Sequence, residues 1–278
     1  MRIAQATLGL ATVAALAALG WSALADPPRP GAALLAASLW TALCTAGVVF
    51  FRAGMLADVL CRGPAGARGV ALTFDDGPDP EHTPRVLDLL DRFGARAAFF
   101  VIGRKAEQHP ELVRAIARRG HALGIHGYAH DRLMSLRWPG AVRRDLERAL
   151  GAVQGATGER PRMFRPPVGP LSQSMARVLR RFGLRVVGWS VRGLDGRRGA
   201  RPERVVRRVV PRLRHGAIVL LHDAAEYGDR EPAGVQALPE ILAAVARAGL
   251  GFARVDQWLE VGGADAQRLP ETGLKRSE

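Results

Sequence analysis

The sequence is poor in cysteine, lysine and aromatic residues. Cys44 and Cys61 are the only cysteines in 278 residues, which excludes a disulfide framework and a cysteine-rich zinc site, because either needs several thiols. Lys105 and Lys275 are the only lysines, so arginine carries almost all of the formal net charge of +14. Aromatic residues make up 6%, which does not indicate a long stacking groove for a polymer. With 48% hydrophobic and 24% charged residues, the composition excludes disorder throughout the chain.

Two charge-free apolar runs occupy the N-terminal region. They cover residues 3–25 and 30–51, and each is longer than the roughly 20 residues that cross a bilayer as a helix. Two prolines between them and Pro30 at the start of the second run stop a helix from continuing. The pattern predicts a transmembrane helical hairpin within a membrane anchor at residues 1–66. The alternative is a cleavable signal peptide at residues 1–25, because Ala23-Leu24-Ala25 fits the small-residue cleavage pattern.

Beyond residue 66, strand-like apolar runs alternate with helical patterns. About seven such units in residues 67–260 indicate parallel strands joined by helical crossovers. The expected fold class is α/β, a distorted or incomplete (β/α) barrel. The expected elements include a helix over 106–119, a strand over 185–190 and a last strand over 252–255. Residues 261–278 show no periodicity and are expected to form a polar tail.

Acidic and histidine residues stand where the expected strands end. Asp75 and Asp76 directly follow a buried strand, and neighbouring carboxylates point in different directions, so one can ligate a metal while the other holds a water. His126 and His130 are four apart, and in a helical turn both imidazoles face the same way. Alone, Asp-Asp-Gly-Pro is a common turn and a histidine pair is more often structural. Together they predict an open, catalytic divalent-metal site of two imidazoles and one carboxylate.

Three more polar residues follow later strands. Arg165 can hold a carboxylate with two parallel hydrogen bonds, although a surface position is the simpler interpretation of one arginine in so arginine-rich a chain. Asp195 lies five residues beyond an expected strand. His222 closes another strand, where a carboxylate partner would raise its pKa and make it a proton donor.

Taken together, five stretches resemble the polysaccharide deacetylase family, also called the NodB-homology domain or carbohydrate esterase family 4. The resemblance extends from about Gly69 to Glu260. Five motifs in the family's order are far more specific than any one of them. The matching residues are Thr73-Phe74-Asp75-Asp76-Gly77-Pro78, the pair His126 and His130, Arg165-Pro166-Pro167, Asp195, and Leu220-Leu221-His222.

The resemblance implies a metal-dependent hydrolase that removes an N-acetyl or other small N-acyl group from an amino sugar. It implies one divalent metal, with zinc as the expected ion and cobalt or manganese as alternatives. The implied roles are metal ligation by Asp76, His126 and His130, general base for Asp75, orientation of Asp75 by Arg165, contact with the substrate oxygen by Val168 and Pro167, and proton donation by His222, kept protonated by Asp195.

Several positions depart from the family's pattern. Val168 stands where an aromatic residue usually follows the prolines, Arg192 where the fourth motif is usually acidic, and Gly196 where that motif usually has tryptophan. Ile125 and Gly127 replace the residues that usually flank the first histidine. These departures motivate an alternative, a catalytically degenerate, membrane-tethered sugar-binding relative. The retained metal and acid–base residues favour the enzyme.

The expected partners are an amino-sugar substrate, in a glycan or on a lipid carrier, and the membrane. The arginine-rich helix expected over 202–213 has two interpretations, a solvated face in an arginine-rich chain or contact with anionic headgroups. Binding of a polyanion or nucleic acid is a further alternative, but no recognition motif is visible and no nucleic-acid partner is expected.

Charge also predicts the side of the membrane on which the soluble domain lies. Arg52, Arg62 and Arg68 follow the second apolar run, so the positive-inside rule predicts a cytoplasmic domain in a bacterial-type inner membrane. A polymer or cell-wall substrate would require an extracytoplasmic domain instead. The sequence therefore leaves the side open.

Overall fold

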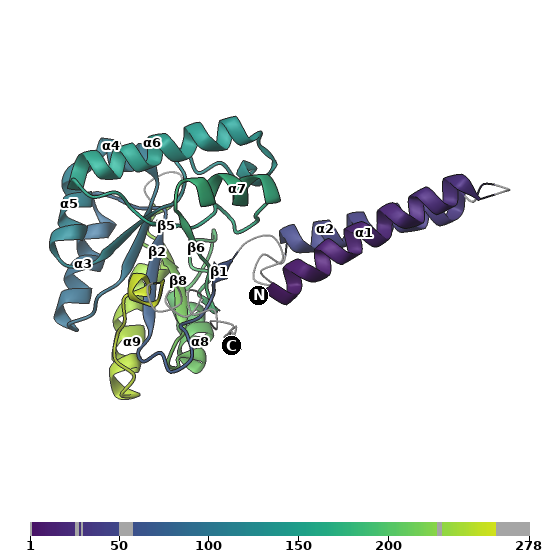
Figure 1. The fold of residues 1–278 in the computed structure, drawn as a ribbon. Helices are drawn as coiled ribbons and strands as arrows, with labels where there is room; N and C mark the ends of the chain where they lie inside the picture. Colours follow the sequence, from purple (N-terminus) through teal and green to yellow (C-terminus); the bar gives the residue numbers. More distant parts are fainter. Residues whose placement is uncertain (1, 26–27, 29, 50–57, 227–229, 260–278) are drawn as a thin grey trace, which may run out of the picture.

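The protein was analysed as a computed structural model, which describes residues 2–25, 28, 30–49, 58–226 and 230–259. Two long N-terminal helices precede an α/β domain (Figure 1). The tail expected over 261–278 lies outside the described residues.

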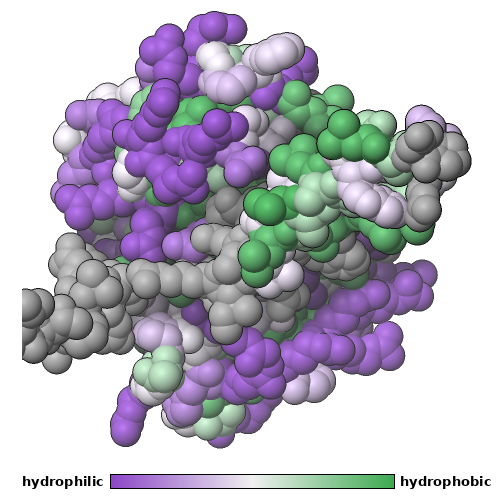
Figure 2. All heavy atoms as spheres, turned by 45° about the vertical axis from the view of Figure 1, so that its right-hand side comes forward, coloured by the Kyte–Doolittle hydropathy of each residue, from purple (hydrophilic) through white to green (hydrophobic). Residues whose placement is uncertain are grey.

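The N-terminal helices α1 (Arg2–Leu24) and α2 (Pro30–Val49) lie side by side (Figure 1). The indole N–H of Trp40 donates to the hydroxyl of Thr12, 3.0 Å away. Large apolar side chains on both helices are exposed, and Figure 2 shows hydrophobic surface gathered along this pair.

One stretch of the described residues, Thr7–Leu24, is long and apolar enough to cross a membrane, and α2 contains a shorter apolar stretch, Pro30–Thr45. A membrane anchor and a signal sequence both have this character. The structure therefore contains the two expected helices, while the two membrane crossings stay a prediction.

Eight strands form a single sheet in which every neighbouring pair is parallel. Their order across the sheet is β1-β6-β5-β4-β3-β2-β8-β7. The strands are β1 (Val59–Leu60), β2 (Ala71–Asp75), β3 (Ala98–Val101), β4 (Ala122–Ile125), β5 (Met163–Phe164), β6 (Arg185–Val187), β7 (Val191–Arg192) and β8 (Ile218–His222).

The sheet is curled into an incomplete barrel. Within the described residues, β1 and β7 are edge strands that do not pair with each other. Only residues 188–190 join β6, beside one edge, to β7 at the other, and such a connection spans at most about 14 Å. Both ends of the sheet therefore lie close together, and the expected distorted or incomplete (β/α) barrel is confirmed.

Helices cover the outer face of the curled sheet (Figure 1). Each buries an apolar stripe against the strands; in α3, for example, Val86, Leu87 and Leu90 are buried. Proline in the first turn begins α5, α6 and α8, where its missing N–H costs no hydrogen bond. The helices are α3 (His82–Arg92), α4 (Gly103–Gln108), α5 (Pro110–Arg118), α6 (Pro139–Thr157), α7 (Gln173–Arg181), α8 (Pro202–Val209) and α9 (Ala233–Arg247).

Three local predictions are wrong. The helix expected over 106–119 is divided into α4 and α5, because Pro110 cannot donate to the preceding turn and begins a new helix. The strand expected over 185–190 is divided into β6 and β7, which pair at opposite ends of the sheet. In the strand expected over 252–255, Phe252 forms one isolated bridge to Val70.

The barrel also begins earlier than residue 67. β1 lies within the segment expected to be part of the anchor, yet it pairs with β6 in the sheet. A two-residue strand carries too little periodicity to be found in the sequence.

His121 is a buried structural residue at the start of β4. Its Nδ1 accepts a hydrogen bond of 3.2 Å from the backbone N–H of Ala97, and its ring packs edge-on against Phe99. Burial, together with the guanidinium of Arg96, lowers the pKa of His121 to about 4. The ring is therefore neutral in the folded protein at pH 7.

His121 should make the folded state less stable in acid. Below a pH of about 6.5 the unfolded chain binds a proton that the folded ring does not take up until about pH 4, so the free energy of unfolding falls across this window by on the order of 3 kcal/mol. A His121→Asn variant keeps an acceptor for the Ala97 N–H but does not titrate. Urea denaturation at pH 7 and at about pH 4.5 should show a smaller loss in the variant, and an equal loss in both proteins would contradict the assignment.

Candidate metal centre and active site

The polar residues singled out in the sequence converge at the carboxyl-terminal edge of the barrel strands. They come from the ends of β2, β4, β5 and β8 and from the loop after β7. A cavity of about 290 Å³ opens there. Its lining includes Asp75, Asp76, His126, His130, Val168, Arg192, Gly196 and His222, while Arg165 and Asp195 have no exposed surface and lie beneath it.

Asp76, His126 and His130 form a compact, buried ligand set. One ligand atom from each lies within 4.8 Å of the other two. The Oδ1 atom of Asp76 is 3.3 Å from Nε2 of His130 and 3.6 Å from Nε2 of His126. These are suitable positions for three atoms that share one ion.

The hydrogen bonds of the two imidazoles determine whether their Nε2 atoms can ligate a metal. Nδ1 of His126 donates to the carbonyl of Arg165 at 2.7 Å, and Nδ1 of His130 donates to Glu226 at 2.8 Å. In the neutral rings Nε2 then carries a lone pair, and burial lowers the pKa of His126, which favours this form. The buried Oδ1 of Asp76 has no hydrogen-bond partner within the described residues. Three acceptor atoms that face one another without a donor fit a divalent cation.

The segment 126–130 is a loop, so the expected helical turn is wrong. Gly127 and His130 have left-handed backbone angles, with φ of 76° and 55°, which a helix does not contain. The carboxylate of Asp145 on α6 accepts from the backbone N–H groups of Tyr128 and Ala129, at 2.7 and 3.3 Å. The two imidazoles converge because hydrogen bonds to α6 fix the conformation of this loop. Their spacing of four residues does not reflect helix geometry.

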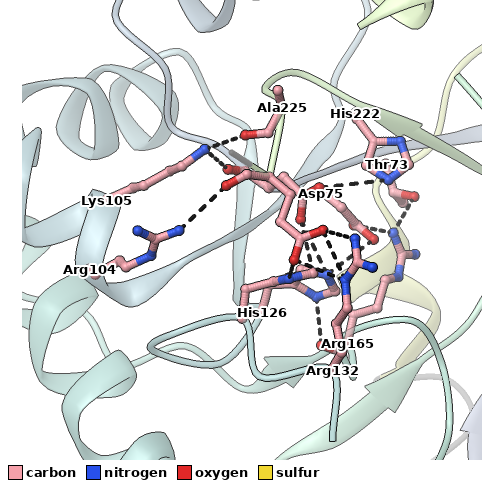
Figure 3. Close-up of polar contacts among 12 residues, drawn as sticks. Thr73, Asp75, Arg104, Lys105, His126, Arg132, Arg165, His222 and Ala225 are labelled. Carbon is pink, nitrogen blue, oxygen red and sulfur yellow. Dashed lines mark hydrogen bonds and ion pairs between the residues drawn. The ribbon is translucent and has the colours of Figure 1, made fainter. Parts of the chain in front are cut away.

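Lys105 fixes the loop that carries Asp76. From α4 its ammonium group donates to the backbone carbonyls of Asp76 and Ala225, at 2.8 and 2.7 Å (Figure 3). The two loops that supply Asp76 and Glu226 are thereby tied together.

Arg165 holds Asp75 in a buried ion pair. Its Nη1 donates to Asp75 Oδ1 at 2.6 Å and to the Thr73 hydroxyl at 2.8 Å (Figure 3). The carbonyls of Val187 and Gly188 accept its other N–H groups. The second carboxylate oxygen of Asp75 lies 3.8 Å from Nε2 of His126, so it faces the ligand set.

His222 is bound twice by Asp195. The carboxylate of Asp195 accepts from the His222 backbone N–H at 2.8 Å and from its Nδ1 at 3.0 Å. Burial disfavours the imidazolium, but the negative charge of Asp195 and its hydrogen bond outweigh burial and raise the pKa of His222 to about 9. Nε2 of His222 points toward Asp76, 4.0 Å from Oδ2.

The two residues expected to contact the substrate oxygen, Val168 and Pro167, lie in different environments. Val168 lines the cavity, has a left-handed φ of 54° and exposes half of its surface. Among the described residues its backbone N–H has no acceptor. Pro167 is buried and is not part of the cavity lining; its ring packs under Gly127 and supports the 126–130 loop. A substrate contact for Pro167 therefore stays a prediction.

Glu226 is the main site residue that the sequence did not reveal. It accepts from Nδ1 of His130 and forms a bidentate ion pair with Arg132. Burial opposes its ionisation, but the hydrogen bonds from Arg132 and His130 and the charge of Arg132 lower the pKa of Glu226 overall, so it is ionised. The only signal in the sequence is an acidic residue four positions after His222, in the loop that follows a strand.

A Glu226→Ala variant should bind a divalent metal about 10- to 100-fold more weakly, because His130 loses the acceptor that fixes its ring. The metal affinity of Glu226→Gln, which keeps an acceptor oxygen, should lie between those of Glu226→Ala and the wild type. Competition with a chelator measures the affinity. Glu107→Ala is the matched control, because Glu107 contacts Tyr128 of the same loop but no candidate ligand. Unchanged affinity in Glu226→Ala would refute this role.

Comparison with known proteins agrees with this arrangement. The sequence model of the polysaccharide deacetylase family matches residues 62–187. A chitooligosaccharide deacetylase of Bradyrhizobium sp. (strain ANU 289) is 40% identical over 168 residues, which cover 59% of this chain and 75% of the relative. A peptidoglycan-N-acetylglucosamine deacetylase of Bacillus cereus is 35% identical over 198 residues, 70% of this chain and 90% of the relative.

A solved structure shares the fold. The Bc1960 peptidoglycan N-acetylglucosamine deacetylase superimposes with a TM-score of 0.67 and 29% identity, over 72% of this chain and 92% of that one. Sequence identity, coverage and fold lead to the same conclusion: this chain belongs to the polysaccharide deacetylase family.

Proposed function

We propose that this protein is a membrane-anchored, metal-dependent hydrolase that removes an N-acetyl or other small N-acyl group from an amino sugar. Its named relatives act on chitooligosaccharide and on the N-acetylglucosamine of peptidoglycan. The observation that carries the proposal is the position of Asp75. One of its oxygens is fixed by Arg165 and the other faces the ligand set of Asp76, His126 and His130.

Zinc is the ion that we propose for this ligand set. Two imidazoles and one carboxylate suit zinc and leave coordination positions open, and cobalt or manganese would fit the same donors. When bound, such an ion polarises the amide carbonyl and lowers the pKa of water. Asp76, His126 and His130 supply the ligands, while Glu226 and the Arg165 carbonyl hold the imidazoles in place.

Asp75 is the proposed general base. Arg165 and Thr73 orient its carboxylate, so the oxygen that faces the cavity can take a proton from the attacking water. The backbone N–H of Val168 donates to the carbonyl oxygen as that oxygen gains negative charge. His222 is the proposed general acid, because Asp195 keeps it protonated and its Nε2 is directed into the cavity. Proton transfer to the leaving nitrogen yields acetate and the free amino sugar.

An Asp75→Asn variant should lose about 10²- to 10⁴-fold in kcat and keep its metal, because the amide cannot accept the proton while Asp76, His126 and His130 are unchanged. Acetate release from chitooligosaccharide and metal analysis of the purified full chain measure the two effects.

Asp88→Asn is the matched control for that variant, since Asp88 is an exposed carboxylate paired with Arg119 outside the cavity. Near wild-type turnover in Asp75→Asn would eliminate Asp75 as the base. Loss of the metal together with turnover would place Asp75 among the ligands instead.

We propose that α1 and α2 anchor the barrel to a membrane as a hairpin. Their exposed apolar side chains and the apolar stretch Thr7–Leu24 support this proposal. With two crossings, the positive-inside rule favours a cytoplasmic barrel, because Arg62 and Arg68 follow the second helix.

A green fluorescent protein fused after Glu278 should therefore fluoresce in membrane fractions, and an alkaline phosphatase fusion at the same position should be inactive. The two reporters are active on opposite sides of the membrane, so each controls for the other. The reverse result would overturn two crossings with a cytoplasmic barrel. N-terminal sequencing of the fusion that finds α1 removed would show that α1 is a signal peptide.

A further inference from the structure

Three arginines line one wall of the cavity. Arg192 ends β7, and Arg197 and Arg198 lie in the loop that follows Asp195. They share this cavity with Asp75, Asp76 and His222, so they lie beside the proposed reaction centre. None of the three is used by the mechanism above.

The backbone of this loop is held at several points. The guanidinium of Arg230 donates to the carbonyls of Gly196 and Arg197, at 3.0 and 3.4 Å. Asp195, between the arginines in sequence, is fixed by its two hydrogen bonds with His222. The arginine side chains therefore extend from a supported segment whose position is coupled to His222.

The positive charge on this wall is offset only in part by the described residues, through the nearby carboxylates of Asp195 and Asp75. No carboxylate among them forms an ion pair with Arg192, Arg197 or Arg198. Partial desolvation and the nearby charge of Arg197 lower the pKa of Arg192, against the charges of Asp195 and Asp75, which raise it. Like charges that are held together cost free energy, which a bound anion offsets. The fourth arginine of the cavity, Arg132, differs because Glu226 pairs with it.

Gly196 packs directly against the ring of His222. A Cβ atom at this position would lie 3.1 Å from Nδ1 of the His222 ring, closer than most real contacts. The absence of a side chain therefore lets the loop that carries Arg197 and Arg198 lie against His222, which places these arginines near the proposed general acid.

We infer that Arg192, Arg197 and Arg198 bind a phosphate group carried by the N-acylated saccharide. This inference rests on the proposed function and specifies its substrate class. Guanidinium groups match phosphate oxygens with paired hydrogen bonds, and a phosphate offers more acceptor oxygens and more charge than a single carboxylate does. The phosphate comes from a lipid carrier or from a water-soluble sugar phosphate, and the chemistry of recognition is the same.

The test compares two matched substrates, the disaccharide of N-acetylglucosamine as its 1-phosphate and as its uncharged methyl glycoside. The full chain in detergent should show at least a tenfold higher kcat/KM for the phosphate, because hydrogen bonds between charged groups are strong. The preference should shrink in about 0.5 M salt, since the arginines are exposed.

A variant with Arg192, Arg197 and Arg198 all changed to Gln should lose this preference. The matched control changes Arg204, Arg207 and Arg208 to Gln, which removes the same charge from the exposed surface of α8 and should keep it. If the triple variant does not fold, the single variants Arg197→Gln and Arg198→Gln are measured in its place.

Equal kcat/KM for the two substrates in the wild type, or an unchanged preference in the cavity variants, overturns the inference and leaves the proposed deacetylase intact. Failure to release acetate from either substrate or from chitooligosaccharide refutes the proposed function itself. A third substrate, the same disaccharide linked through phosphate to a short isoprenoid lipid, shows whether the phosphate group belongs to a lipid carrier or to a soluble sugar phosphate. Faster turnover of this substrate indicates a lipid carrier, and equal turnover indicates a soluble sugar phosphate.

Discussion

The interior of the barrel is organised around a buried cation, Arg165. Its side chain has no exposed surface and is satisfied by Thr73 and Asp75 at the end of β2 and by the carbonyls of Val187 and Gly188 beyond β6. A buried guanidinium that lacked these partners would carry a desolvation penalty of several kcal/mol. The partners come from β2 and from the end of β6, which are far apart in the sheet order, so Arg165 links them across the inside of the curled sheet. The direction of the Asp75 carboxylate therefore depends on a contact that only the folded barrel provides.

The reactive histidines are oriented in the same way as Asp75. In each of them, one atom is fixed by a hydrogen bond to the protein, and another atom faces the cavity. His126 and His130 donate from Nδ1 to the Arg165 carbonyl and to Glu226, so Nε2 of each faces Asp76. Polar groups fixed in this way do not need to reorganise when charge develops in a reaction. The site is thus prepared by the fold before any ligand enters, and the groups that prepare it come from loops and helices as well as from strand ends.

The difference between site residues at strand ends and those in loops and helices explains how much could be predicted from the sequence. Alternation of strands and helices predicted the incomplete barrel, and Asp75, Asp76 and His222 were found because residues at the ends of parallel strands meet at one edge. Glu226 was missed because nothing local links it to His130, which lies 96 positions away. The 126–130 loop was mistaken for a helical turn because left-handed backbone angles leave no periodic pattern. Short strands and tertiary hydrogen bonds depend on the closed barrel, and local sequence does not encode them.

The departures from the family's pattern have a spatial order that the sequence could not show. Three of them, Val168, Arg192 and Gly196, line the cavity beside the matching residues that supply the proposed metal ligands, the base and the acid, whereas Ile125 and Gly127 are not part of its lining. At Val168 the proposed contribution is a backbone N–H, which does not depend on the side chain. Between Arg192 and Gly196, Asp195 keeps both bonds to His222 although its neighbours differ. The wall that would contact the saccharide has therefore changed around an intact set of reactive groups, which argues for a different substrate rather than for lost activity.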